Sequence, residues 1–187
     1  LVLVDAVQSV GQVPVDVTEW GADVVVASGH KWLLGTWGSG FMYVDSDRID
    51  DLEPRRIGYF SVTNPVAEGY EYSPDASRFE LGTTALAPYV GLEASVDLFE
   101  DLGLDTVRTR IGRLTDRLKE GLGERLLSPR DSGSGLVTFA ADDPDGTVER
   151  LAAEGIRIRP IPDPKACRVS VHAFNTREDV DHLLEAL

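Results

Sequence analysis

The stretch "VVVASGHKW" (residues 24–32) decides the fold. Its valines and alanine form a short apolar run that leads, within three positions, to Lys31. "LVLVD" (1–5) is a second run of this kind, and continuous valine-rich runs are typical of strands covered on both faces in a parallel sheet. "GFMYVD" (40–45) follows a glycine-punctuated turn and predicts a third strand. The pattern indicates the α/β class.

Two charged residues come at the ends of these predicted strands. Asp5 ends the first run, and Lys31 lies just past the end of the second. Ligands of open α/β sheets bind at the carboxyl ends of the strands, so we expect the two charges to share one crevice. On spacing alone, an Asp–Lys ion pair or a lysine that extends to water is the favoured explanation of the pattern.

Composition and charge exclude several classes of protein. A hydrophobic content of 42% is enough for a core, and no apolar stretch approaches the roughly 20 residues that a spanning helix needs. The net charge of −14 opposes binding to nucleic acids and to anionic membranes. We expect a soluble, cytoplasmic protein without nucleic-acid or membrane partners.

The balance of ionisable residues favours a salt-loaded cytoplasm. The chain has 32 acidic residues and fifteen arginines but only three lysines, and a halophilic origin explains this slightly better than a merely acidic protein does. The single cysteine, Cys167, cannot form an intrachain disulfide or a thiolate metal site. No metal ligands are predicted.

The remainder of the chain predicts a loop region, two helices and a second lobe. Residues 46–84 lack a clear period and carry aromatic side chains, as active-site loops do. Two helical stripes follow, the second from Leu104 to Leu122, and a strand and helix pattern restarts near residue 130. In the final helix, Thr176 and Asp179 have the spacing of a capping box.

Four stretches of sequence, in this order, resemble one family. "VDAVQSVGQVPVDV" (4–17) precedes "GADVVVASGHKWLLGTWGSGFMYV" (21–44), and "RFELGTT" and "CRVSVHAFNTREDVDHLLEAL" follow. The chain resembles the class V aminotransferases among the fold-type I pyridoxal-phosphate enzymes, which include cysteine desulfurases, selenocysteine lyases and isopenicillin-N-epimerase-like proteins.

The resemblance implies both a fold and a domain division. We expect the C-terminal part of a fold-type I large domain plus a small C-terminal α+β domain. The large domain would occupy residues 1–103, a connecting helix 104–129, and the small domain 130–187. About half of a complete family member would precede the first strand, and the chain begins inside that strand, so we expect a fragment or a removed start.

The resemblance also implies the roles of the residues around the cofactor ring. Lys31 would form the internal Schiff base with pyridoxal 5'-phosphate and later move the substrate's Cα proton. Asp5 would keep the pyridine nitrogen protonated, so that the ring can act as an electron sink. Gln8 would donate a hydrogen bond to the ring's 3-oxygen.

Further residues would bind the phosphate and the substrate. Ser28 and His30 would hold the phosphate, with a satisfied core histidine as the alternative for His30. Thr83 would reach the phosphate of a neighbouring subunit, which implies a homodimer. Arg168 would bind the α-carboxylate of a small amino-acid substrate, since its planar fork matches a carboxylate.

One departure from the family limits the reaction. Cysteine desulfurases carry a catalytic cysteine upstream of the carboxylate-binding arginine, whereas Cys167 directly adjoins Arg168 on a predicted strand and should point to the opposite face. The usual persulfide mechanism is therefore disfavoured, and transamination, elimination, racemisation or selenocysteine lysis stay open. The alternative is a truncated or degenerate homologue without catalytic activity that serves as a structural or interaction module.

Overall fold

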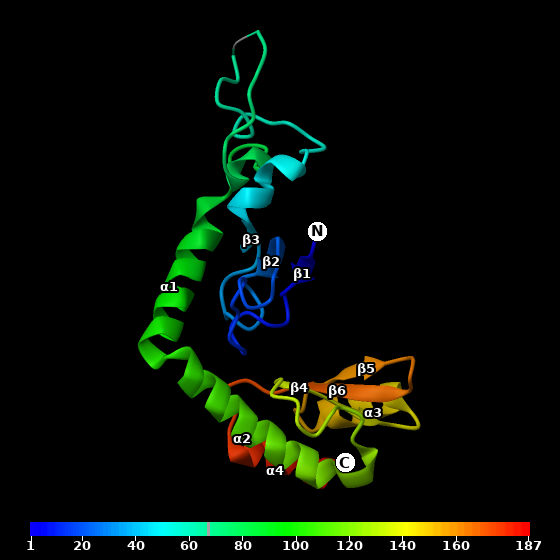
Figure 1. Cartoon of the computed structure of the whole chain (residues 1–187). Helices are drawn as coiled ribbons and strands as arrows, with labels where there is room; N and C mark the ends of the chain where they lie inside the picture. Colours follow the sequence, from blue (N-terminus) through cyan, green and yellow to red (C-terminus); the bar gives the residue numbers. More distant parts are fainter. Residues whose placement is uncertain (67) are drawn as a thin grey trace. The chain divides into compact units, whose positions relative to one another are not determined.

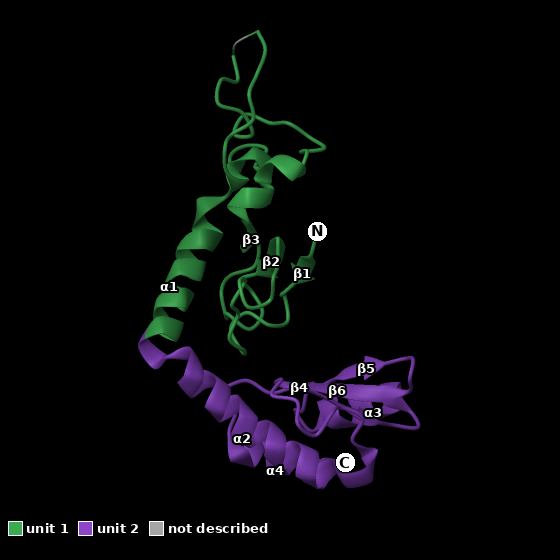
Figure 2. Cartoon of the chain, in the orientation of Figure 1, with its two compact units in different colours: residues 1–100 green, residues 101–187 purple. Residues whose placement is uncertain are grey.

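The computed structural model describes residues 1–66 and 68–187, and these form two compact units. The first unit comprises Leu1–Glu100 and the second Asp101–Leu187 (Figure 2). The boundary lies close to residue 103, where the sequence places the end of the large domain. The helix predicted as a connection, at residues 104–129, falls within the residue range of the second unit.

The first unit is built on a three-stranded mixed sheet. Strands β1 (Leu3–Asp5), β2 (Val24–Ser28) and β3 (Gly40–Val44) lie in the order β1-β2-β3 (Figure 1). β1 and β2 are parallel, whereas β2 and β3 are antiparallel. The three strands predicted from the apolar runs are confirmed. β3 turns back against β2 because residues 29–39 form a compact turn instead of a crossover helix.

The two faces of the sheet are not equally covered. Ala6, Ala22 and Val25 form a buried cluster, and half-buried Val4 and Trp20 pack against it. β1, by contrast, lies at the edge of the sheet, and Leu3 is 61% exposed. Burial of this strand on both faces, as its apolar run predicts, is therefore not observed within the described chain.

The segment predicted as a loop region contains two short 3-10 helices, Ser46–Asp51 and Ala76–Phe79. A buried arginine joins them. Arg78 donates hydrogen bonds to the carbonyls of Ser73 and Ile49 at 2.8 Å each, and forms an ion pair with Asp50 at 3.1 Å. Helix α1 (Leu86–Leu102) follows and buries Leu92, Ser95 and Phe99.

The second unit is an α+β layer structure. Its sheet has the order β4-β6-β5, and both pairings are antiparallel. The elements in chain order are α2 (Leu104–Leu122), β4 (Leu136–Ala140), α3 (Pro144–Ala153), β5 (Arg159–Ile161), β6 (Ala166–Ser170) and α4 (Arg177–Ala186).

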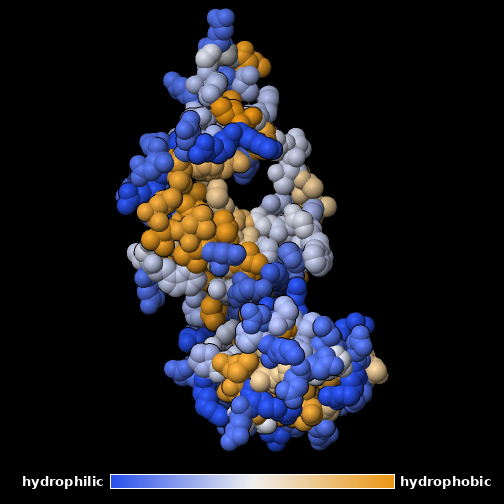
Figure 3. All heavy atoms as spheres, turned by 90° about the vertical axis from the view of Figure 1, so that its right-hand side faces the viewer, coloured by the Kyte–Doolittle hydropathy of each residue, from blue (hydrophilic) through white to orange (hydrophobic). Residues whose placement is uncertain are grey.

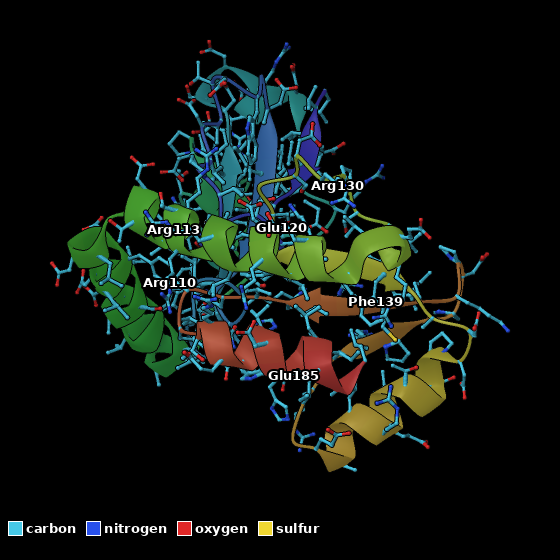
Figure 4. The ribbon with its side chains drawn as sticks, turned by 90° about the horizontal axis from the view of Figure 1, so that it is seen from below. Arg110, Arg113, Glu120, Arg130, Phe139 and Glu185 are labelled. Atoms are coloured by element: carbon cyan, nitrogen blue, oxygen red, sulfur yellow. The ribbon has the colours of Figure 1, made fainter. Side chains whose placement is uncertain are left out.

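A single apolar core holds this unit together. Ile111 and Leu118 of α2 are fully buried, and Leu118 shares a cluster with Phe139 of β4 and Leu183 of α4. Figure 4 shows α2 and α4 side by side, with Phe139 on the adjacent strand. α2 packs into the unit because its apolar stripe has a sheet and a helix to cover it.

The final helix begins as its sequence predicts. Thr176 and Asp179 form a complete capping box, in which each side chain accepts a hydrogen bond from the other residue's backbone N–H. The bond from the Thr176 N–H is the largest cause of a lowered pKa at the Asp179 carboxyl.

Candidate functional site

The candidate site is centred on the carboxyl ends of β1 and β2. The parallel register pairs Asp5 with Val26, and Ser28 lies two residues further along β2. Paired residues of neighbouring strands share a face, and so do residues two apart on one strand. Asp5 and Ser28 therefore lie on the same face at the same end of the sheet, as the resemblance implies for a cofactor site.

Lys31 lies in the tight turn that follows β2. The turn is closed by two backbone hydrogen bonds, from Leu34 N–H to the Lys31 carbonyl at 2.9 Å and from Gly35 N–H to the Gly29 carbonyl at 2.8 Å. Leu34 has a φ of 59°, in the left-handed region that residues with a side chain rarely adopt. Such a turn persists only where surrounding contacts enforce it.

Helix α1 provides these contacts. The Thr36 hydroxyl donates to the Pro88 carbonyl at 2.6 Å, and the Ser95 hydroxyl donates to the carbonyl of Leu33. Gly91 packs so closely on Thr36 that an added Cβ would lie 2.5 Å from its methyl group. Helix α1 thus holds the backbone on either side of Leu34, at Leu33 and at Thr36.

Asp5 and Lys31 do not form an ion pair with each other. No ion pair or hydrogen bond of the described chain involves the Lys31 ammonium group, and its side chain is half-buried. One oxygen of the exposed Asp5 carboxylate accepts from the Val7 N–H at 3.0 Å. The simple ion-pair explanation of the sequence is therefore not observed, and both groups are available to a ligand.

Ser28 supplies a test of whether a cofactor fits here. Its hydroxyl oxygen is buried and has no hydrogen-bond partner among the described residues. Buried polar atoms in native proteins are nearly always paired, so an unpaired hydroxyl at the end of a strand indicates a ligand position. A phosphate oxygen, which accepts hydrogen bonds, suits it.

His30 lies between Ser28 and Lys31 and is oriented by stacking. Its ring is stacked on that of Trp37, with centroids 4.3 Å apart and planes 21° from parallel. Trp37 is 81% exposed, so the pair is not a core contact. The ring of His30 is half-buried, and no hydrogen bond within the described chain occupies either nitrogen. The satisfied core histidine is therefore not observed.

Gln8 follows β1 and is linked to the residue after Lys31. The indole N–H of Trp32 donates to the Gln8 side-chain oxygen at 2.9 Å. The sequence showed both residues but not this bond, because their positions differ by 24 along the chain. Neither Trp32 nor Trp37 was predicted as a site residue. The sequence feature that could have identified them is their position close to Lys31.

Two predicted residues lie outside the strands β1 and β2 and the turns that follow them. Thr83 is exposed in the irregular segment before α1. Arg168 lies on β6 in the second unit, half-buried, and its Nε is buried without a partner in the described chain. Arg159 of β5 is directly opposite it in the antiparallel register, so two guanidinium groups of like charge share one face.

Cys167 is unsuited to carry sulfur. Its side chain is fully buried in the core of the second unit, and burial is the largest cause that raises the pKa of its thiol. The thiolate, not the thiol, is the nucleophile, so a raised pKa lowers reactivity. The expectation of a packed thiol on the face opposite Arg168 is confirmed.

The comparison with protein families decides the relationship. The family model Aminotransferase class-V matches residues 1–183. The chain belongs to the class-V aminotransferase family. A probable cysteine desulfurase of Methanothermobacter thermautotrophicus is 31% identical over 100% of the chain and 52% of its own length. The isopenicillin N epimerase of Streptomyces clavuligerus is 29% identical over 99% of the chain and 51% of its own length.

A solved structure of the family contains the cofactor. The chain superimposes on a lysine-to-alanine mutant of C-DES, which has glycine covalently linked to its PLP cofactor, with a TM-score of 0.85 and 28% identity. The match covers 95% of this chain and 49% of that one. The predictions of the family and of an α/β fold are therefore confirmed.

The length of the match sets its limits. The chain spans about half the length of the curated relatives it matches. Its assignment to the C-terminal part of a family member, and the division into large and small domains, stay predictions.

The described residues show neither a membrane span nor a cluster of metal ligands. None of their helices combines the length and apolar character needed to cross a bilayer. The same residues contain no group of three or more histidine, cysteine or acidic side chains arranged to hold a metal ion.

Proposed function

We propose that this chain binds pyridoxal phosphate through Lys31 and belongs to an enzyme that acts on a small amino acid. The proposal rests on the arrangement of side chains at the carboxyl ends of β1 and β2. There, Asp5 and Lys31 follow two adjacent parallel strands without pairing with each other, next to the buried unpartnered hydroxyl of Ser28. Folding by itself does not require this combination.

Each residue has a definite task in this proposal. The bound cofactor supplies an electron sink for the substrate's Cα electrons. The Asp5 carboxylate holds a proton on the pyridine nitrogen, and the Lys31 amine anchors the cofactor and moves the Cα proton. The Ser28 hydroxyl and the edge of the His30 ring bind the phosphate.

Two further roles belong to the same proposal. Arg168 binds the α-carboxylate of the substrate, supported by its buried unpartnered Nε. Thr83 serves the phosphate site of a second copy in a homodimer, supported by its exposure and by the many exposed apolar side chains of the first unit (Figure 3). A cytoplasmic location and a halophilic origin stay predictions from composition.

The reaction type follows from Cys167. The chain has no other cysteine, and this one is buried with a raised thiol pKa. A reaction that passes sulfur to a cysteine of this chain is therefore disfavoured, although several relatives are named cysteine desulfurases. Transamination, epimerisation or elimination by Lys31 requires no thiol.

The test is covalent labelling. The chain is incubated with pyridoxal phosphate, reduced with borohydride and digested, and the modified peptide is identified by mass spectrometry. We expect the label on Lys31, and we expect Lys31→Ala to abolish the absorbance of the bound cofactor. Lys165→Ala is the matched control, because Lys165 is exposed and should contribute only non-specific labelling.

A panel of amino acids then separates the reactions. Keto-acid formation, loss of chirality and sulfide release are measured for each amino acid with a chain that has been loaded with pyridoxal phosphate and not reduced. Sulfide release that requires Cys167 would contradict the proposed reaction type. A chain that stays colourless with the cofactor would contradict the proposal and favour the non-catalytic alternative.

A further inference from the structure

The hydrogen bond between Trp32 and Gln8 fixes the orientation of the Gln8 amide. Trp32 is 5% exposed, and its Nε1 lies 2.9 Å from Gln8 Oε1. An indole N–H can only donate, so the amide must turn its oxygen toward Trp32. The amide nitrogen then faces elsewhere, and within the described chain it has no partner. Gln8 therefore presents a donor.

The main chain of Gln8 is held as well. The side-chain amide of Gln12, itself 3% exposed, donates to the Gln8 carbonyl. Gly11 has a φ of 98°, and a Cβ placed there would lie 2.5 Å from the carbonyl carbon and oxygen of Trp32. The turn after β1 thus packs directly on the backbone of the turn that carries Lys31.

We propose that Trp32 is a positioning residue that acts through Gln8. It keeps the Gln8 amide nitrogen directed at an acceptor oxygen of pyridoxal phosphate. Because this nitrogen can only donate, Gln8 then favours an ionised oxygen on the cofactor ring. Because Trp32 follows Lys31 directly, the same turn positions both the lysine that anchors the cofactor and, through Trp32, the amide N–H of Gln8. The inference rests on the proposed function and extends it to a residue that does not touch the cofactor.

The first experiment tests the hydrogen bond without cofactor. The chain has three tryptophans, so a ¹⁵N–¹H spectrum contains three indole signals, which Trp20→Phe, Trp32→Phe and Trp37→Phe assign. We expect the indole proton of Trp32 to exchange with solvent slowly, and at least about tenfold faster in Gln8→Leu. Equal exchange rates in the two proteins would overturn the inference.

The second experiment tests the consequence for the cofactor. The apparent dissociation constant for pyridoxal phosphate is measured by absorbance, without substrate. Trp32→Phe should weaken binding about three- to tenfold, the range of one neutral hydrogen bond. Gln8→Leu should weaken it similarly, and the double variant should be no weaker than Gln8→Leu, because Trp32 acts only through this amide.

Gln8→Glu separates positioning from packing. A carboxylate still accepts from Trp32 but presents no donor to the cofactor, so this variant should keep slow indole exchange and lose cofactor affinity. Trp20→Phe is the control, since Trp20 packs against the buried cluster of Ala6, Ala22 and Val25, and this variant should leave binding unchanged.

The outcomes distinguish the two proposals. Wild-type uptake of cofactor together with unchanged affinity in Trp32→Phe, or with fully additive losses in the double variant, overturns the positioning role alone. If the wild-type chain takes up no cofactor, the proposed function fails and the cofactor part of this inference fails with it. The indole exchange rates still decide whether Trp32 holds Gln8.

Discussion

The two units of the chain are stabilised in different ways. In the second unit, α2, α4 and the sheet enclose one apolar cluster, and among the described residues only Leu102, Leu104, Leu127 and Phe174 are large exposed apolar side chains there. In the first unit such side chains are numerous, and Trp37 and Leu3 are 81% and 61% exposed. Its buried groups include many polar ones: Gln12, Ser39, Ser61, Ser73, Arg78 and Ser95.

The difference separates a structural core from a scaffold for a site. The apolar core of the second unit is complete in itself, and burial of this kind is non-directional. The first unit positions its turns through hydrogen bonds, which are directional and hold particular atoms in place. Lys31, Gln8 and Ser28 lie in the unit that uses the directional interactions.

Removal of an aromatic ring from the core of the second unit should lower the free energy of unfolding more than the other changes below. Phe139→Ala replaces a side chain that is 1% exposed in the second unit, and we expect a loss of about 3–5 kcal/mol in its free energy of unfolding. Amide hydrogen exchange of β4 and β6 measures it. Phe41→Ala in the first unit, where Phe41 is 43% exposed, is the matched control and should cost less than about 1 kcal/mol. Equal losses would remove the distinction between the units.

Removal of a buried donor should have a smaller effect, confined to the first unit. Arg78→Met keeps the length of the side chain but leaves the Ser73 and Ile49 carbonyls without their donor, at a cost of about 2–3 kcal/mol. Limited proteolysis should then cut within residues 46–80 faster. Arg56→Met, an exposed arginine of the same segment, should change nothing. An unchanged cutting rate in Arg78→Met would show that apolar contacts suffice there.

The smallest expected effect is a pH dependence of the last helix. The folded-state pKa of Asp179 is lowered from its ordinary value of 3.8, chiefly by the Thr176 backbone N–H. The ionised carboxylate therefore stabilises α4 fully when the pH is above 3.8. This contribution should decrease as the pH falls below that value and through the folded-state pKa. Hydrogen exchange of α4 against pH measures it. Asp179→Asn should reduce the slope, and an identical slope would exclude this carboxyl as the cause.

Periodicity predicted the second unit well because its core is made by regular elements. The α2 stripe, the strand at β4 and the capping box of α4 all follow from patterns within a few residues. The role of residues 104–129 as a connecting helix stays a prediction, since a stripe shows that a face is buried but not which neighbour buries it. The exposure of β1 was missed for the same reason, because an apolar run does not state whether the sheet continues beside it.

The sequence by itself determined the family, the three strands of the first unit and the position of Asp5 and Lys31 at the ends of two of them. These depend on residue types and on local spacing. Only the tertiary structure decided that Asp5 and Lys31 stay unpaired, that Ser28 lacks a partner and that Trp32 orients Gln8. Each of these is a contact, or the absence of one, between segments distant in the chain, and hydrogen-bond geometry exists only once those segments have packed.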